Sequence, residues 1–197
     1  MSTLVLASSS AYRAALLSRL GIEFQTATPD VDESPLPGEA ASILVARLAE
    51  AKARGVAVNH PNALIIGSDQ VAVHTMGNTA AMLGKPHTAA RARAQLLEVS
   101  GRQVQFLTSV CLLNAASNRL QLRVIETPVT FRKLSRKEIA RYVELEQPLD
   151  CAGAFKSEGL GIALVEFVGG EDPNALIGLP LITLCTMLRV EGVSVLV

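Results

Sequence analysis

The sequence predicts an α/β fold built on a mixed sheet. Short apolar segments alternate with helical patterns over the first hundred residues, which is typical of strands flanked by helices. Beyond residue 102, two long strand-like stretches follow one another across an Asn/Ser-rich turn, and such a hairpin would extend the sheet antiparallel. Because 197 residues suffice for one sizeable core, we expect a single domain over residues 1–197.

The apolar pattern places the elements in chain order. It predicts a strand at 4–7, a helix from there to residue 20, a helix over 39–54, a strand at 63–67, a helix over 89–99 and long strands within 103–117 and 119–134. Ser135 and Glu138 have the spacing of a capping box and open a helix toward Glu146. Pro180 and Gly192 bracket a terminal helix. The least regular regions, 28–38, 74–86 and 150–161, are where a site would lie.

The composition gives no sign of a nucleic-acid or membrane partner. Lys and Arg number 18, as do Asp and Glu, so the formal net charge is zero and nothing indicates nucleic acid or an anionic membrane as partner. The first apolar segment is too short for a signal sequence and no apolar run reaches the length of a membrane span. The three cysteines share no close spacing, which argues against a disulfide framework or a structural zinc site. We therefore expect a cytoplasmic protein whose cysteines are buried small apolar residues.

Two cations fall on the apolar faces of their helices. At about 100° per residue, Arg13 lies in the stripe of Leu16, Leu17 and Leu20. Lys52 falls likewise on the apolar side of the helix over 39–54. A buried cation needs an internal carboxylate or a bound anion, so each is either part of a structural ion pair, a snorkelling side chain or an anion ligand.

Ser8 and Ser10 lie where the first strand gives way to the first helix. Hydroxyls and free backbone N–H groups converge there at a partly positive helix end, which predicts a phosphate cradle with Arg13 in the first turn. The alternative is a simple N-cap by Ser10.

Asp69 is the best single catalytic candidate. It follows the apolar segment ALIIG, which would place its carboxylate at the carboxyl end of a central strand, where sites of α/β sheets lie; an ordinary turn residue is the alternative. Asp30, Asp32 and Glu33 in the loop PDVDESPLPG can supply oxygen ligands for a hard cation, or form a solvated acidic turn. Lys85 in LGKP presents a second ammonium group from a tight turn. This set suits a polyphosphate bridged to the protein by a divalent ion such as Mg²⁺ or Mn²⁺.

Several motifs in the same order resemble the Maf-type nucleoside triphosphate pyrophosphatases. LASSSAYRAALL is similar to the opening serine-rich motif of that family, VDES to its acidic loop, RLAEAKA to its lysine helix, GSDQV to its aspartate motif and LGKP to its second lysine. DCAGAFKSEGLG and the IGLP before the last helix also match, so the resemblance covers nearly the whole chain.

Three positions resemble the subgroup that prefers 7-methyl-GTP. Tyr12 stands where members acting on dTTP and UTP carry arginine, Gln70 where they carry threonine, and Glu158 where they carry glutamine. Chemistry gives this an independent rationale, because N7-methylation makes guanine cationic and Tyr12 would stack on it by a cation–π contact. Glu158 would accept from the guanine N1–H and amine, and Gln70 would add an amide. On the residues alone, the favoured interpretation is that Tyr12 is a surface aromatic and Glu158 a solvated loop residue.

The resemblance implies an extended twisted sheet flanked by helices, in two lobes with a nucleotide cleft between them. It implies hydrolysis between the α and β phosphates, with Glu33 and Asp69 as metal ligands, Asp69 also as base, and Ser8, Ser10, Arg13, Lys52 and Lys85 on the phosphates. Such enzymes are often homodimers. A competing hypothesis is a nucleotide-binding regulator of cell division with incidental hydrolysis, although binding alone does not need a carboxylate pair. The segment HTMGNTAAM before LGKP is longer than in related sequences.

Overall fold

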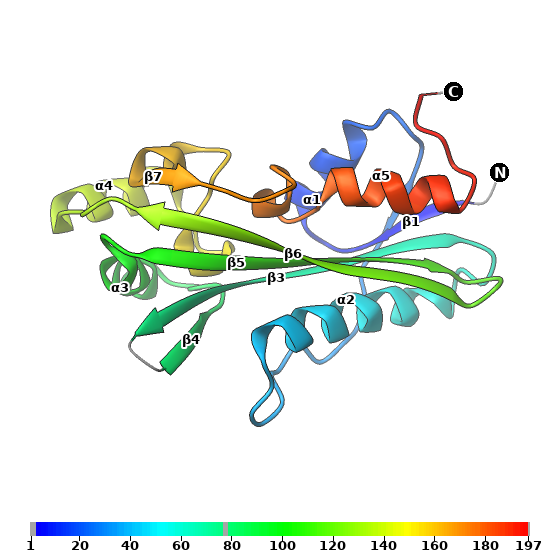
Figure 1. Cartoon of the computed structure of the whole chain (residues 1–197), viewed down its shortest axis with the longest axis horizontal. Coiled ribbons are helices and arrows are strands. Elements are labelled where there is room, and N and C mark those ends of the chain that lie inside the picture. Colours follow the sequence, from blue (N-terminus) through cyan, green and yellow to red (C-terminus); the bar gives the residue numbers. More distant parts are fainter. Residues whose placement is uncertain (1–2, 77–78, 197) are drawn as a thin grey trace. The chain divides into compact units, whose positions relative to one another are not determined.

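The computed structural model describes residues 3–76 and 79–196, over which a seven-stranded mixed sheet carries five α-helices (Figure 1). The strands are β1 Leu4–Ala7, β2 Gln25–Ala27, β3 Leu64–Met76, β4 Thr79–Leu83, β5 Gln103–Asn114, β6 Arg119–Phe131 and β7 Val165–Val168. The helices are α1 Ala11–Ser18, α2 Ala41–Ala57, α3 Ala89–Val99, α4 Arg136–Glu146 and α5 Leu181–Val190, with 3₁₀ turns η1 Ala152–Ala154, η2 Leu160–Leu164 and η3 Ala175–Ile177. The α/β class and the mixed sheet are confirmed.

The strand order is β2-β1-β3-β5-β6-β7, and β4 pairs separately with β3. β1 runs parallel to both neighbours, with Val5 opposite Gln25 and Ile65. β4 is antiparallel to β3, and β7 is antiparallel to β6 with an irregularity at Thr130/Phe131. Within the described chain, no helix has the length and apolar character that crossing a membrane needs.

The chain folds as two compact units, each assembled from separate stretches of sequence. Unit 1 comprises residues 1–69, 108–125 and 172–197, and unit 2 comprises residues 70–107 and 126–171. β3, β5 and β6 contribute residues to both.

Unit 1 has an apolar layer on each face of its strands. α1 and α5 cover one face and α2 covers the other (Figure 1). Alternation along β1 serves both layers, because Leu4 and Leu6 join the first while Val5 and Ala7 join the second. Both helices that carry the predicted cations therefore pack on this part of the sheet.

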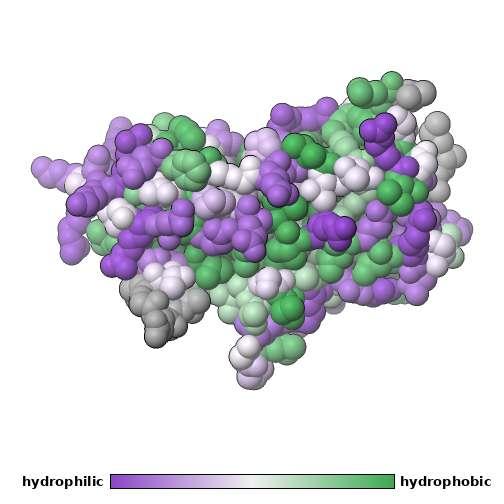
Figure 2. Space-filling view, in the orientation of Figure 1, coloured by the Kyte–Doolittle hydropathy of each residue, from purple (hydrophilic) through white to green (hydrophobic). Residues whose placement is uncertain are grey.

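Unit 2 is built around aromatic side chains. Phe155 contacts Phe106 at 5.7 Å and Phe131 at 5.2 Å between ring centroids, the second pair edge-on. α3 and α4 pack on each other. α4 begins with the predicted capping box of Ser135 and Glu138. Hydrophilic residues gather over α4 in Figure 2, in agreement with its exposed charged side chains.

The prediction that the strand after ALIIG ends before Asp69 is wrong. β3 continues to Met76, so Asp69 lies within the strand. The polar run GSDQ is typical of a turn, but in this strand its polar groups form hydrogen bonds with Ser109. Ser68 Oγ donates to the Ser109 carbonyl at 2.7 Å, and Asp69 N–H donates to Ser109 Oγ at 3.1 Å. The strand therefore passes through polar residues without leaving them unpaired.

Two of the three regions expected to be irregular contain regular structure. The segment 74–86 includes the end of β3 and all of β4, so much of the long HTMGNTAAM stretch forms a hairpin; its residues 77 and 78 lie outside the described residues. The segment 150–161 includes η1 and the start of η2. Residues 28–38 form neither helix nor strand, as predicted.

Candidate active site

The serine-rich motif forms the junction between β1 and α1. Ser10 is the N-cap of α1, and its Oγ accepts from Arg13 N–H at 3.4 Å, which confirms the capping alternative for this residue. Ser8 is buried, and its Oγ accepts from Ser10 N–H at 3.1 Å. Both hydroxyls thus lie at the amino end of α1, and their contacts with phosphate remain a prediction.

Arg13 points inward, as its place on the helix predicts. Its Nε donates to the Gly178 carbonyl at 2.9 Å, and one terminal nitrogen lies 3.5 Å from Ser8 Oγ. Burial lowers the pKa of Arg13 below its usual value. The negative charges of Asp69 and Glu33 raise this pKa, but by less than burial lowers it. The Gly178 carbonyl therefore fixes one nitrogen of a guanidinium on which the charges of two carboxylates act.

Lys52 meets both carboxylates that the sequence selects. Its Nζ lies 2.6 Å from Asp69 Oδ1 and 2.8 Å from Glu33 Oε1. The side chains of Lys52 and Asp69 are only 6% and 12% exposed, while that of Glu33 is 56% exposed. The buried ammonium group of Lys52 therefore binds one carboxylate from the acidic loop and one from a central strand. The ion-pair alternative for Lys52 is confirmed.

The backbone places Lys52 and Asp69 with little freedom. A Cβ on Gly67 would fall into the Ala49 carbonyl and lie 3.2 Å from Ala53 Cβ, so α2 packs directly on β3 at this residue. Asp69 follows Gly67 by two residues and Lys52 follows Ala49 by three, which brings both side chains to the same contact between helix and strand.

The carboxylate pair suits a divalent cation that takes only some of its ligands from the protein. Both acids already share one cation, so their oxygens can reach a common positive charge. Among the described residues, no group of three or more His, Cys, Asp or Glu side chains gathers as a metal site. A Mg²⁺-type ion held by one or two carboxylates and completed by water and substrate phosphates fits this donor set.

The remaining candidates are partly or fully exposed. Tyr12 is half-buried on α1 of unit 1. Gln70, Lys85 and Glu158 belong to unit 2, where Gln70 is half-buried in β3 and the other two are exposed. The turn before Lys85 is braced, because the Gly84 carbonyl accepts at 3.2 Å from both Gly153 N–H and Gln95 Nε2.

Sequence reasoning did not anticipate the partners that hold these groups. Gly178 supplies a carbonyl to Arg13, and Ser68 and Ser109 support the strand around Asp69. The IGLP match contains Gly178, but a side-chain pattern carries no signal for the direction of a carbonyl.

A groove of about 500 Å³ also lies on unit 1, and none of the candidate residues lines it. Arg19, Asn174, Cys185 and Arg189 are among its lining residues. The candidate active site is therefore the charged cluster rather than this groove.

Comparison with known proteins assigns the family. Residues 3–191 match the family model described as "Maf-like protein". The chain is 55% identical to "7-methyl-GTP pyrophosphatase" of Pseudomonas putida over 99% of its own length and 100% of the relative. It is 53% identical to the protein of that name in Pseudomonas aeruginosa, with the same coverage, and 54% identical to that of Nitrosococcus oceani over 98% of this chain and 96% of the relative. The acidic, lysine and aspartate motifs of the sequence bring Glu33, Lys52 and Asp69 into contact, and the match extends over almost the full length, so the chain belongs to the Maf-like protein family.

Proposed function

We propose that this chain hydrolyses the bond between the α and β phosphates of 7-methyl-GTP, giving 7-methyl-GMP and pyrophosphate. The observation that carries the proposal is the pair of carboxylates, Glu33 and Asp69, that converge on Lys52 beside Arg13. The names of relatives at 53–55% identity support this substrate. A carboxylate pair beside two cations favours hydrolysis over binding alone, because a regulator that only senses a nucleotide has no use for a base.

A divalent cation, Mg²⁺ or Mn²⁺, held by Glu33 and Asp69 would polarise the α phosphate and acidify a bound water. Asp69 orients a water molecule and takes its proton while the water oxygen attacks the α-phosphorus. The bond from that phosphorus to the bridging oxygen then breaks, and pyrophosphate leaves with the electron pair. Arg13 and Lys52 balance the charge on the triphosphate and the leaving group, and Ser8 and Ser10 add hydrogen bonds.

Four roles rest on the sequence motifs. Lys85 neutralises phosphate charge, as its LGKP motif indicates. Tyr12 stacks on the cationic base, Glu158 accepts from the guanine N1–H and amine, and Gln70 contributes an amide. Unmethylated guanine would lose the cation–π term, which makes the N7-methyl group a determinant of affinity. A cytoplasmic location and a homodimeric state remain predictions.

Product analysis tests the proposal. The purified protein is incubated with 7-methyl-GTP, GTP, UTP or dTTP, with and without Mg²⁺ or Mn²⁺, and pyrophosphate is measured separately from orthophosphate. We expect metal-dependent pyrophosphate, formed mainly from 7-methyl-GTP. Pyrophosphate mainly from UTP or dTTP would remove the roles given to Tyr12, Gln70 and Glu158, and binding without product would favour the regulator.

Asp69→Asn should lower turnover on the order of a thousandfold, because a positioned base contributes about 10²- to 10⁴-fold. Glu50→Gln is the matched control, since Glu50 pairs with Arg54 on α2 at 2.7 Å and takes no part in the cluster. Circular dichroism checks that both variants fold. An Asp69→Asn protein with full turnover would remove Asp69 from its proposed role.

A further inference from the structure

The carbonyl of Gly178, in the IGLP motif before α5, lies within hydrogen-bond distance of two side chains. Arg13 Nε donates to it at 2.9 Å, and Ser68 Oγ, one residue before Asp69, lies 2.9 Å from the same oxygen. This carbonyl therefore contacts both the arginine and the strand of the candidate active site, and all of these residues belong to unit 1.

The contact uses Nε of Arg13, which leaves the edge formed by its two terminal nitrogens for an anion. A guanidinium has five N–H groups in a rigid fork, and its two terminal nitrogens form the edge that matches an anion bidentately. With Nε bound to Gly178, the orientation of that edge is fixed while most of its donors stay available. A lysine at this position would keep the charge and lose the contact that fixes its direction.

The backbone at Gly178 is one that glycine adopts and other residues rarely do. Its φ is +122°, and an added Cβ would lie 3.6 Å from Arg13 Nε and 3.8 Å from Arg13 Cγ. A side chain here would thus strain the backbone of the turn, and its Cβ would lie in ordinary van der Waals contact with Arg13.

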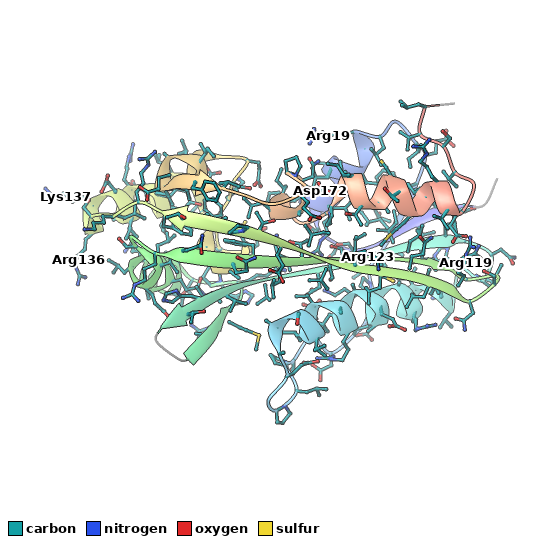
Figure 3. The ribbon with its side chains drawn as sticks, viewed as in Figure 1. Arg19, Arg119, Arg123, Arg136, Lys137 and Asp172 are labelled. Carbon is teal, nitrogen blue, oxygen red and sulfur yellow. The ribbon has the colours of Figure 1, made fainter. Side chains whose placement is uncertain are left out.

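A buried carboxylate braces the turn that contains Gly178. Asp172, labelled in Figure 3, is 2% exposed. Its Oδ2 accepts from Ile182 N–H, at the start of α5, at 2.7 Å, and its Oδ1 accepts from Asn174 N–H at 3.1 Å. Gly178 N–H in turn donates to the Ala175 carbonyl at 2.9 Å and lies 3.3 Å from the Asn174 carbonyl. The segment is therefore tied at both ends, which holds the Gly178 carbonyl in one place.

We propose that Gly178, braced by Asp172, is a positioning residue that aims the terminal nitrogens of Arg13 at the phosphates of the substrate. The inference rests on the proposed function and deepens it, since it names what orients the phosphate-binding arginine. Gly178 acts through Arg13 and does not itself touch the substrate.

A double-mutant cycle between Gly178→Ala and Arg13→Lys tests the proposal. KM and kcat are measured with 7-methyl-GTP, and the affinity for inorganic tripolyphosphate is measured by calorimetry without turnover. Gly192→Ala is the matched control, because Gly192 also has a positive φ, +76°, and nothing lies within 4 Å of its added Cβ. Asp172→Asn is a second variant that keeps the shape of the brace, in case Gly178→Ala folds poorly.

In the wild-type background we expect Gly178→Ala to raise KM and weaken tripolyphosphate binding on the order of tenfold, with a smaller change in kcat. In the Arg13→Lys background the same change should have almost no further effect. Asp172→Asn should show the same dependence on Arg13, and Gly192→Ala should leave KM and kcat near their wild-type values.

Equal losses in both backgrounds, with normal wild-type turnover, would overturn the positioning role and leave the proposed function intact. A wild-type protein that forms no pyrophosphate, but whose tripolyphosphate affinity still shows the coupling, would overturn the proposed reaction and keep the positioning role. If Gly192→Ala weakened substrate and tripolyphosphate binding as much as Gly178→Ala does, backbone strain alone would explain the effect, and the inference would be overturned.

Discussion

Lys52 contacts both carboxylates of the candidate active site, and its burial decides what a substitution would do. In a buried ion pair, removal of one partner leaves an uncompensated charge, which costs far more than the pair contributes when intact. Without Lys52, the carboxylate of Asp69 would be left buried within β3 with no counter-charge from Lys52. Glu33 is more than half exposed, so its carboxylate can be solvated by water.

Lys52→Met should therefore lower the free energy of unfolding by about 3 to 5 kcal/mol. Chemical denaturation followed by circular dichroism measures this. Arg54→Met is the control on the same helix, because its ion pair with Glu50 is exposed and should contribute at most about 1 kcal/mol. Equal losses for the two variants would show that the buried contact has no special role in stability.

The inward direction of Arg13 and Lys52 could be predicted from the sequence, while their partners could not. A helical projection places each cation on the apolar side of its own helix, which depends only on local geometry. The partners come from distant segments: Lys52 lies 17 residues before Asp69, and Arg13 lies 165 residues before Gly178. Pairing across such separations is a product of tertiary packing, and the carbonyl of Gly178 leaves no trace in a side-chain pattern.

At the scale of the elements, prediction succeeded where local signals agreed. α3 begins at Ala89 and ends at Val99 as expected, and β5 and β6 form the predicted pair of long strands. β2, β4 and β7 were not predicted, because they are short, at three to five residues, and depend on pairing with neighbouring strands. Short segments with weak alternation offer too little periodicity to separate a strand from a loop.

The capping box of α4 gives a prediction with a pH dependence. Ser135→Ala should cost about 1 kcal/mol at pH 7, because it removes the acceptor for Glu138 N–H at 3.2 Å. It also removes the hydroxyl that donates to Glu138 Oε2 at 2.6 Å. Hydrogen bonds from the Ser135 side chain, and next from its backbone, lower the pKa of Glu138.

A lowered carboxyl pKa stabilises the fold above the usual value of 4.5, and this contribution is lost as the pH falls through the folded value. The difference between Ser135→Ala and wild type should therefore narrow at pH 3 relative to pH 7. Urea unfolding at the two pH values measures it, with Ser117→Ala, an exposed serine in the β5–β6 turn, as control. The same difference at both values would contradict a role for the Glu138 carboxylate.

At the scale of the whole molecule, the charge pattern is local rather than global. The 18 basic and 18 acidic residues cancel, so no broad field attracts an anion. What an anionic substrate would meet is the arrangement of a few side chains in unit 1, where buried Lys52 contacts two acids and half-buried Arg13 feels the charges of the same acids. Bulk composition gives no indication of nucleic acid as a partner, and only the order of the motifs indicates a nucleotide.

Ligand-linked stability tests the proposed substrate on the intact chain. A 7-methyl-GTP analogue with a methylene group between the α and β phosphates, at about 100 times its Kd, should raise the free energy of unfolding by about 2.7 kcal/mol. For a chain of this length, Tm should rise by about 5 to 10 °C, measured by calorimetry with Mg²⁺ present. The matching GTP analogue at the same concentration should give a smaller shift, because its base lacks the positive charge. Equal shifts would remove the preference for the methylated base.

Gly67 shows how an active-site distance can be set by something the chain leaves out. With no Cβ at this residue, the backbone of α2 rests on the backbone of β3, and the two side chains that follow, Lys52 and Asp69, meet across that contact. A single methyl group would act as a wedge between helix and strand and lengthen the gap between the base and its counter-ion. The contact between α2 and β3 at Gly67 therefore has no room for even one additional carbon atom, although Gly67 itself has no functional group.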